Sequence, residues 1–201
     1  SSTPVMIGAH SSFPPKSFQE FIAYVKANPG KVNFTSCGLA SPQHLAGEIL
    51  NSMAGMNMIH VPYKGCGPAE IDVLAGRVPV NISNVTRFMP HIRAGKLRGY
   101  ALGGAKRSQF APDYPTVGES GFPGYDVEVW FGLLAPGRTP KEIVTRLNAE
   151  VNRVLALPDI KERLSSQAYE PIGGTPEKFA QAIRSDIERY GKVIREAGIK
   201  A

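Results

Sequence analysis

The chain repeats one local pattern twice between residues 32 and 70. In each copy an apolar, β-branched run leads into a loop of small residues, and a proline stands where a helix would begin. The first copy reads VNFT-SCGLA-SPQHL over residues 32–45, and the second reads MIHV-PYKGC-GPAE over residues 58–70. Proline favours the first helical position and Ser or Gly favours the position before it. We therefore expect helices that begin at Pro42, after Ser41, and at Pro68, after Gly67.

Two such helices would begin side by side, at the carboxyl ends of parallel strands. A helix N-terminus offers unpaired N–H groups and a partial positive charge. Ligands of open α/β sheets usually bind at this edge. The repeated pattern therefore predicts a binding site for a small anion such as a carboxylate.

Size and composition place the chain among ordinary globular proteins. Its 201 residues suffice for one α/β domain or two small lobes, and no apolar run is long enough to span a bilayer. The net charge of +6 fits attraction of acidic ligands, or a basic surface without a specific partner. The Lys and Arg residues are dispersed and not interleaved with aromatic residues, so we expect no nucleic-acid partner.

The two cysteines, Cys37 and Cys66, fall in the two loops of the repeated pattern. If the strands before these loops are neighbours, the thiols come within disulfide reach. The other interpretation is two free, buried thiols. Neither cysteine has the paired Cys/His spacing of a metal site.

Apolar spacing and turn residues predict alternating strands and helices up to about residue 104. Strands are expected at residues 4–9, 32–35, 58–61, 78–82 and 97–103, and an extended segment at 126–134. Helices are expected after Ser17, in the two repeats, and from about residue 85. From Thr139 onward the pattern is helical, with Thr139 and Thr175 as caps. The order predicts an α/β fold with a mostly parallel sheet and flanking helices.

Several short motifs resemble those of the substrate-binding proteins of tripartite tricarboxylate transporters, the Bug-type periplasmic receptors. They are ANPGKVN (27–33), SPQHLAGE (41–48), HVPYKG (60–65), AGKLR (94–98), GFPGY (121–125), WFGLLAP (130–136) and GIK (198–200). The resemblance covers nearly the whole chain.

That resemblance implies a periplasmic-binding-protein-like, two-lobed receptor that closes on a small carboxylate and serves membrane transporter subunits. It implies binding by backbone amides and small polar side chains, without metal or cofactor. Residues 1–134 would be the second-lobe ligand-binding domain with its crossover strand. Residues 135–201 would be a helical region that normally packs on the first lobe.

Two departures from the family pattern affect these expectations. Family members carry a further N-terminal stretch, so the resemblance implies that part of the first lobe is missing here. The apolar faces of the C-terminal helices would then pack against another partner, such as a second copy in a homodimer. Many relatives also have an acidic residue where this chain has Ser83 and Asn84, which favours a plain carboxylate over an amino acid as the ligand.

The candidate ligand-binding residues lie in the two loops and after the third parallel strand. They are Ser36, Gly38, Ser41, Gln43, His44, Tyr63, Lys64, Gly65, Gly67 and Asn84. Several also have a purely structural interpretation: Ser41 as an N-cap, His44 as a hydrogen-bonding residue of the first turn, Lys64 as a solvated charge, Gly65 and Gly67 as residues that the backbone geometry requires, and Asn84 as a cap. Trp130 is expected to pack in the core.

The sequence contains no pattern typical of catalysis. It has no Gly-x-Ser-x-Gly elbow and no phosphate-binding loop. Its four histidines lie on separate predicted elements without zinc spacing. The leading hypothesis is therefore a periplasmic carboxylate receptor. The alternative is a receptor remnant that acts as an oligomeric interaction protein without a ligand.

Overall fold

The computed structural model describes residues 1–199, so Lys200 of the GIK motif lies outside the described residues. The chain divides into two compact units. The larger contains residues 4–129 and 193–199, and the smaller contains residues 1–3 and 130–192.

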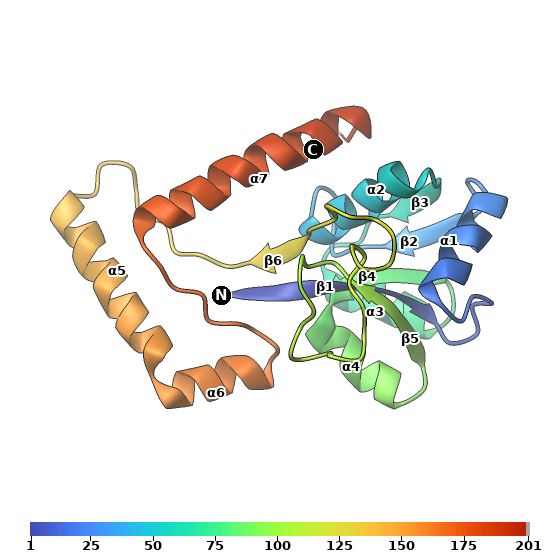
Figure 1. Cartoon of the computed structure of the whole chain (residues 1–201), viewed down its shortest axis with the longest axis horizontal. Coiled ribbons are helices and arrows are strands. Elements are labelled where there is room, and N and C mark those ends of the chain that lie inside the picture. The colour runs from blue at the N-terminus through green and yellow to red at the C-terminus, as the bar shows by residue number, and fades with distance from the viewer. Residues whose placement is uncertain (200–201) are drawn as a thin grey trace. The chain divides into compact units, whose positions relative to one another are not determined.

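A β-sheet forms the centre of the larger unit (Figure 1). Its strands lie in the order β3-β2-β4-β1-β5, and the short β6 also pairs with β1. The bounds are β1 Ser2–His10, β2 Val32–Thr35, β3 Met58–Val61, β4 Val80–Asn84, β5 Leu97–Leu102 and β6 Glu128–Trp130. The strands expected from the sequence are therefore present, although the extended segment contains only three residues of strand.

The sheet is mixed, because one strand runs antiparallel to its neighbours. The alternation of strands and helices in the sequence did not indicate this reversal. Strands β3, β2 and β4 pair in parallel, as the expected mostly parallel sheet requires. Strand β1 pairs antiparallel with both β4 and β5. Because β1 alone is reversed among these five strands, β2, β3 and β4 still end at one common edge, and the α/β fold class is confirmed.

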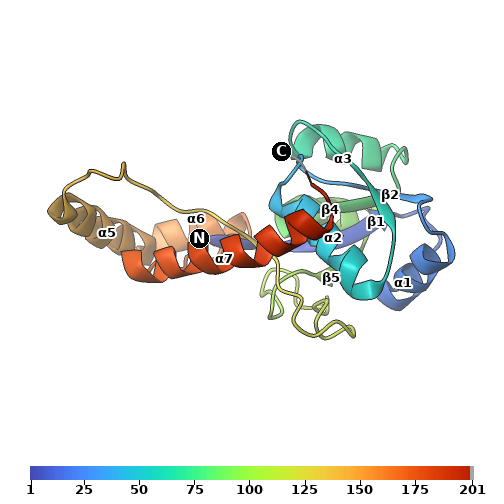
Figure 2. The same ribbon diagram turned by 90° about the horizontal axis from the view of Figure 1, so that it is seen from above.

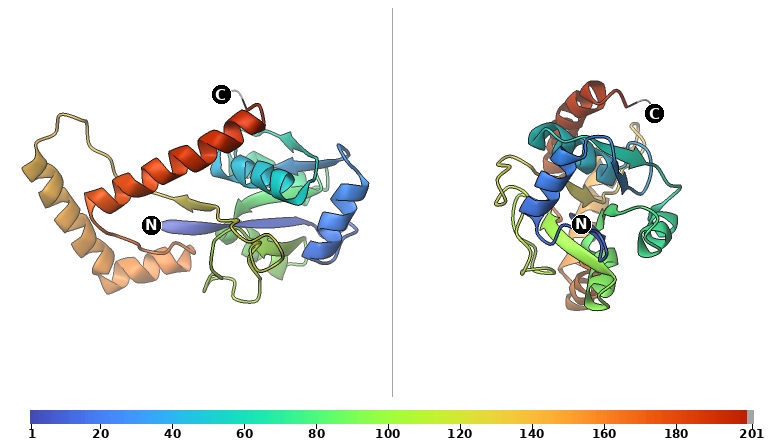
Figure 3. Two further views of the ribbon diagram at one scale, coloured as in Figure 1. Left: turned by 45° about the horizontal axis from the view of Figure 1, so that its top comes forward. Right: turned by 90° about the vertical axis from the view of Figure 1, so that its right-hand side faces the viewer.

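Helices cover both faces of this sheet (Figures 2 and 3). They are α1 Phe18–Ala27, α2 Pro42–Ala54, α3 Cys66–Leu74 and α4 Val85–Arg93. Buried residues of α1 and α2 share a core cluster with Val5, Ile7 and Ala9 of β1. Since side chains alternate along a strand, the residues between them face the other side, where a Cβ on Gly8 would meet the Phe88 ring of α4.

Local sequence rules account for the ends of α2. Ser41 is its N-cap, with a hydroxyl that accepts from the His44 amide at 3.3 Å, and Pro42 occupies the first position. Gly55 ends it in the left-handed conformation, φ 59°. Between these ends Gly47 lies against the Phe34 ring, where a Cβ would collide. The glycine therefore lets α2 approach β2 closely.

Helix α3 begins earlier than the sequence indicates. We expected Gly67 as its cap and Pro68 as its first residue, but the helix begins at Cys66 with Gly65 before it. Pro68 is then the third helical residue. This position is compatible with proline, since the first amides of a helix have no partner within it.

The smaller unit contains the helices α5 Lys141–Ala156, α6 Pro158–Ser166 and most of α7 Pro176–Glu196. None of the residues of these helices is buried. The expected cap Thr175 accepts from the Lys178 amide, whereas α5 begins at Lys141 without a side-chain cap from Thr139.

Trp130 is not a core residue of the smaller unit. Its side chain is 39% exposed, its indole N–H donates to Asp186 at 2.7 Å, and its ring packs edge-on against Phe179.

Among the residues that the structure describes, no helix is long and apolar enough to cross a membrane.

Candidate anion-binding site

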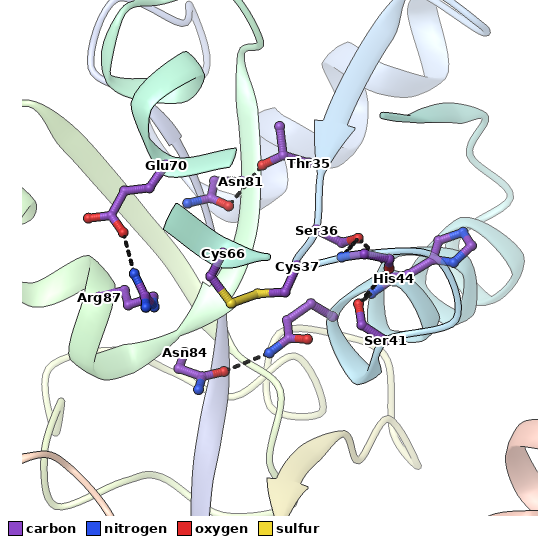
Figure 4. Close-up of a disulfide and its surroundings, with 12 residues drawn as sticks. Thr35, Ser36, Cys37, Ser41, His44, Cys66, Glu70, Asn81, Asn84 and Arg87 are labelled. Atoms are coloured by element: carbon purple, nitrogen blue, oxygen red, sulfur yellow. Dashed lines mark hydrogen bonds and ion pairs between the residues drawn. A yellow bond between two sulfur atoms is a disulfide. The ribbon is translucent and has the colours of Figure 1, made fainter. Parts of the chain in front are cut away.

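The N-termini of α2, α3 and α4 gather around the carboxyl end of β4 (Figure 4). The Gln43 amide in the first turn of α2 donates to Asn84 Oδ1, just before α4, at 2.8 Å. Glu70 of α3 pairs with Arg87 of α4 at 2.8 Å. The sequence predicted two neighbouring helix N-termini at this edge, and the structure adds α4 as a third.

The Cys37–Cys66 disulfide forms, which decides between the two interpretations of the cysteines. It joins the β2–α2 loop to the first residue of α3. The Gly65 amide also donates to the Cys37 carbonyl at 3.0 Å. Gly65 has φ +108°, a conformation that side chains of L-residues rarely permit. The two loops of the repeated pattern are therefore bound both covalently and through the backbone.

The β2–α2 loop has its own hydrogen-bond network, formed largely by candidate residues. The Ser36 hydroxyl donates to the Gly38 carbonyl at 2.9 Å and accepts from the Gly38 amide at 3.2 Å. The Ser41 hydroxyl also donates to the Gly38 carbonyl, at 2.8 Å. Ala40 has φ 56°, in the left-handed region that non-glycine residues seldom occupy. These contacts fix the backbone that leads into α2.

The three helix N-termini differ in how their amides are satisfied. Helix α2 is capped by Ser41. Within residues 1–199, no side chain caps α3, which follows Gly65, or α4, which follows Asn84. First-turn amides without a capping oxygen are donors that an anion can occupy.

Asn84 itself is suited to receive an anion. It is buried, and its side-chain oxygen accepts from Gln43, so its Nδ2 group remains the donor end of the amide. A second buried polar pair joins β2 to β4, where Thr35 Oγ1 donates to Asn81 Oδ1 at 2.9 Å. Sequence reasoning missed Thr35 and Asn81, although each is a polar residue within a strand that is buried at its position.

Three of the ten candidates lie apart from this network. The Tyr63 hydroxyl donates to Asp72 at 2.7 Å, and burial together with that bond raises the pKa of Tyr63 to about 12. The Lys64 side chain is exposed. Gly67 lies inside the first turn of α3, with open space where a Cβ would be.

The structure also reveals a residue that the sequence did not single out. The His60 ring stacks on His44 with centroids 3.6 Å apart, and its Nε2 lies 2.7 Å from Ser36 Oγ. Its place on β3, two residues after buried Met58, was the available signal, since alternation puts both on one face.

Among the described residues no group of three or more His, Cys, Asp or Glu side chains could hold a metal ion.

Comparison with known proteins identifies the family to which this arrangement belongs. Residues 1–199 match the model of the tripartite tricarboxylate transporter family receptor. The chain belongs to this receptor family. The family comprises binding proteins rather than enzymes, as the sequence led us to expect.

Curated relatives of this chain are longer than the chain itself. It is 34% identical over 197 residues to the protein BugT of Bordetella pertussis, covering 98% of this chain and 60% of BugT. It is 37% identical over 198 residues to a protein from the tcbD–tcbE intergenic region of a Pseudomonas species, covering 98% of this chain and 58% of that protein. The chain thus spans less than two thirds of the length of these relatives.

Solved relatives share the fold. The chain is 34% identical to Rpa4515 of R. palustris, solved with adipate, with a TM-score of 0.89 over 98% of this chain and 66% of that one. It is 32% identical to MatC of Rhodopseudomonas palustris, solved with bound malate, with a TM-score of 0.82 over 96% of this chain and 67% of that one. The periplasmic binding protein BugD gives 0.85 at 32% identity, over 99% of this chain and 67% of BugD. The resemblance to the Bug-type receptors is therefore confirmed.

Proposed function

We propose that this chain is the carboxylate-binding part of a periplasmic receptor, which delivers a small dicarboxylate or similar organic acid to the membrane subunits of a tripartite tricarboxylate-type transporter. The observation that carries the proposal is the gathering of three helix N-termini at the carboxyl end of β4, two of them without a side-chain cap. Such a site attracts negative charge through aligned peptide dipoles and free amides.

The chemistry of the surrounding residues favours a plain carboxylate. Asn84 presents a neutral amide donor at the point where α4 begins. Neither Ser83 nor Asn84 supplies the negative charge that would pair with the ammonium group of an amino acid. The adipate and malate found in two solved relatives are both dicarboxylates, which supports the same ligand class.

Isothermal titration with adipate and with malate tests this proposal. We expect saturable binding to the wild type that is abolished by Asn84→Asp. This variant keeps the oxygen that accepts from Gln43 but adds a negative charge at the site. Asn33→Asp, which makes the same change at an exposed position of β2, is the matched control and should bind normally. Equal binding by both variants would contradict the assigned site.

A second candidate function is self-association through the C-terminal helices. Ile143 and Leu147 of α5 are 46% and 55% exposed, and Ile187 of α7 is 66% exposed. Burying such apolar faces against a second copy would be favourable. Light scattering over a range of concentrations should then show a dimer that Leu147→Glu dissociates, and a monomer at all concentrations would exclude this function.

A further inference from the structure

Two histidines from different elements form a stacked pair behind the β2–α2 loop. His44 lies in the first turn of α2 and His60 lies on β3, with ring planes 15° apart. His44 is only 3% exposed, and Phe34 lies against both rings. A contact this close between two imidazoles is compatible with neutral rings and disfavours two cations.

Each ring holds one polar group of the loop. Nδ1 of His44 accepts from the Ala40 amide at 3.0 Å, so that nitrogen carries no proton. Ser36 Oγ donates to the Gly38 carbonyl, and His60 Nε2, at 2.7 Å, is then its donor. The His44 bond therefore requires an Nδ1 without a proton, whereas the His60 bond requires a proton on Nε2 and persists in the charged ring.

The bond to Ala40 holds a strained point of the backbone. A non-glycine residue in the left-handed region is strained and persists only where its surroundings hold it. Ala40 lies directly before Ser41, the cap of α2, and three residues after Cys37 of the disulfide. Loss of the His44 acceptor would free this segment between two fixed points.

We propose that His44 and His60 are positioning residues that hold residues 36–41 in the ligand-binding conformation, and that protonation of the pair releases this loop and weakens binding of the carboxylate. The binding part of this inference rests on the proposed function. A proton on Nδ1 of His44 removes the acceptor for Ala40. A proton on His60 places a charge against His44.

The groups around His60 determine how it titrates. Burial, and then the neighbouring His44, lower the pKa of His60 to about 4, while Glu48 opposes this effect. Glu48 belongs to α2, and its Oε1 lies 3.6 Å from Nε2 of His44. On β2 the neighbours are Phe34 and Ser36, which carry no charge in this range. Acid must therefore overcome the neutral state of His60 that the fold favours.

Substitutions can separate the hydrogen bond from the titration. His44→Asn places an amide oxygen where Nδ1 stands and cannot be protonated in this range, whereas His44→Leu removes the acceptor. His60→Gln retains an N–H donor toward Ser36. His10→Asn changes a histidine at the far end of β1, whose Nδ1 contacts Ser12, and is the matched control.

The experiment measures adipate affinity at pH 7.5 and pH 4.5, together with NMR exchange of the Ala40 amide. At pH 7.5 we expect His44→Leu to bind at least tenfold more weakly and to exchange Ala40 faster, while His44→Asn stays within about threefold of the wild type. The double variant His44→Asn/His60→Gln should lose less affinity at pH 4.5 than the wild type or His10→Asn. Protonation of adipate itself changes the affinity of all these proteins by the same factor, so it cancels when their pH dependences are compared.

The outcomes distinguish this proposal from the proposed function. If the wild type does not bind adipate or malate, the proposed function fails, and acid-induced exchange at Ala40, absent from the double variant, still decides on the histidine pair. If the double variant keeps the wild-type acid profile in both measurements, the positioning proposal is overturned. Should His44→Leu fail to fold, the comparison of wild type and double variant remains decisive.

Discussion

Gln43 and Asn84 are joined by a 2.8 Å hydrogen bond between two buried amides that lie 41 positions apart in the chain. The bond ties the first turn of α2 to the end of β4. Since α3 is bound to the β2–α2 loop by the disulfide, the three helix N-termini form one connected structure.

A double-mutant cycle should measure this bond. We expect Gln43→Ala and Asn84→Ala each to lower the free energy of unfolding by about 1–3 kcal/mol, because each leaves a buried amide unpaired. The loss in the free energy of unfolding of the double variant should be smaller than the sum of the two single losses, with a coupling energy of about 1 kcal/mol. Urea denaturation provides these values, and strictly additive effects would show that the bond does not form in solution.

The disulfide should contribute strongly to stability. Cys37 and Cys66 close a loop with a sequence separation of 29, which corresponds to about 3.5 kcal/mol in the chain-entropy model. We expect reductant to lower the midpoint of urea unfolding of the wild type and to leave Cys37→Ser/Cys66→Ser unchanged. A wild-type midpoint that is the same with and without reductant, after reduction has been verified by thiol alkylation, would refute this contribution.

Gly47 should tolerate no side chain. An added Cβ would collide with the Phe34 ring, so Gly47→Ala should destabilise the protein by about 1–3 kcal/mol through overpacking. Gly67→Ala is the matched control, since it lies in a helix with open space at the Cβ position, and should be neutral or stabilising by up to about 1 kcal/mol. Thermal unfolding of both variants tests the close packing of α2 on β2.

Acid should destabilise the fold partly through His60. Its pKa falls from 6.5 in the unfolded chain to about 4 in the folded protein, so the folded state binds fewer protons between these values. The contribution of neutral His60 to the free energy of unfolding is fully present above pH 6.5 and is lost as the pH falls toward 4. Urea unfolding at intervals from pH 7.5 to 4 should show a smaller decline for His60→Gln than for the wild type, and parallel declines would contradict this assignment.

Local rules made much of this fold predictable from the sequence. The ends of α2 follow from Ser41, Pro42 and Gly55, each acting on its own neighbours in the chain. The start of α3 was wrong by two residues, because a helix can begin at Cys66 and place Pro68 where no amide partner is lost. The reversed direction of β1 depends on pairing with distant strands, which no local pattern encodes.

The candidate site was predictable in position but not in its contacts. Helix starts placed the loops at one sheet edge, and the structure connects seven of the ten residues there through hydrogen bonds. The sequence carried no signal for the stacking of His44 on His60, since the two are 16 positions apart and meet only when β3 lies beside β2. Tyr63 binds Asp72 because α3 brings that carboxylate within reach.

The most direct test of the central claim is an NMR titration of the backbone amides with adipate and malate. We predict saturable shifts concentrated at residues 37–44, 65–67 and 84–87, which are the loop and first turns of α2, α3 and α4, and their loss in Asn84→Asp. Shifts spread over other surfaces, or none at millimolar ligand, would contradict a carboxylate site at this edge of the sheet.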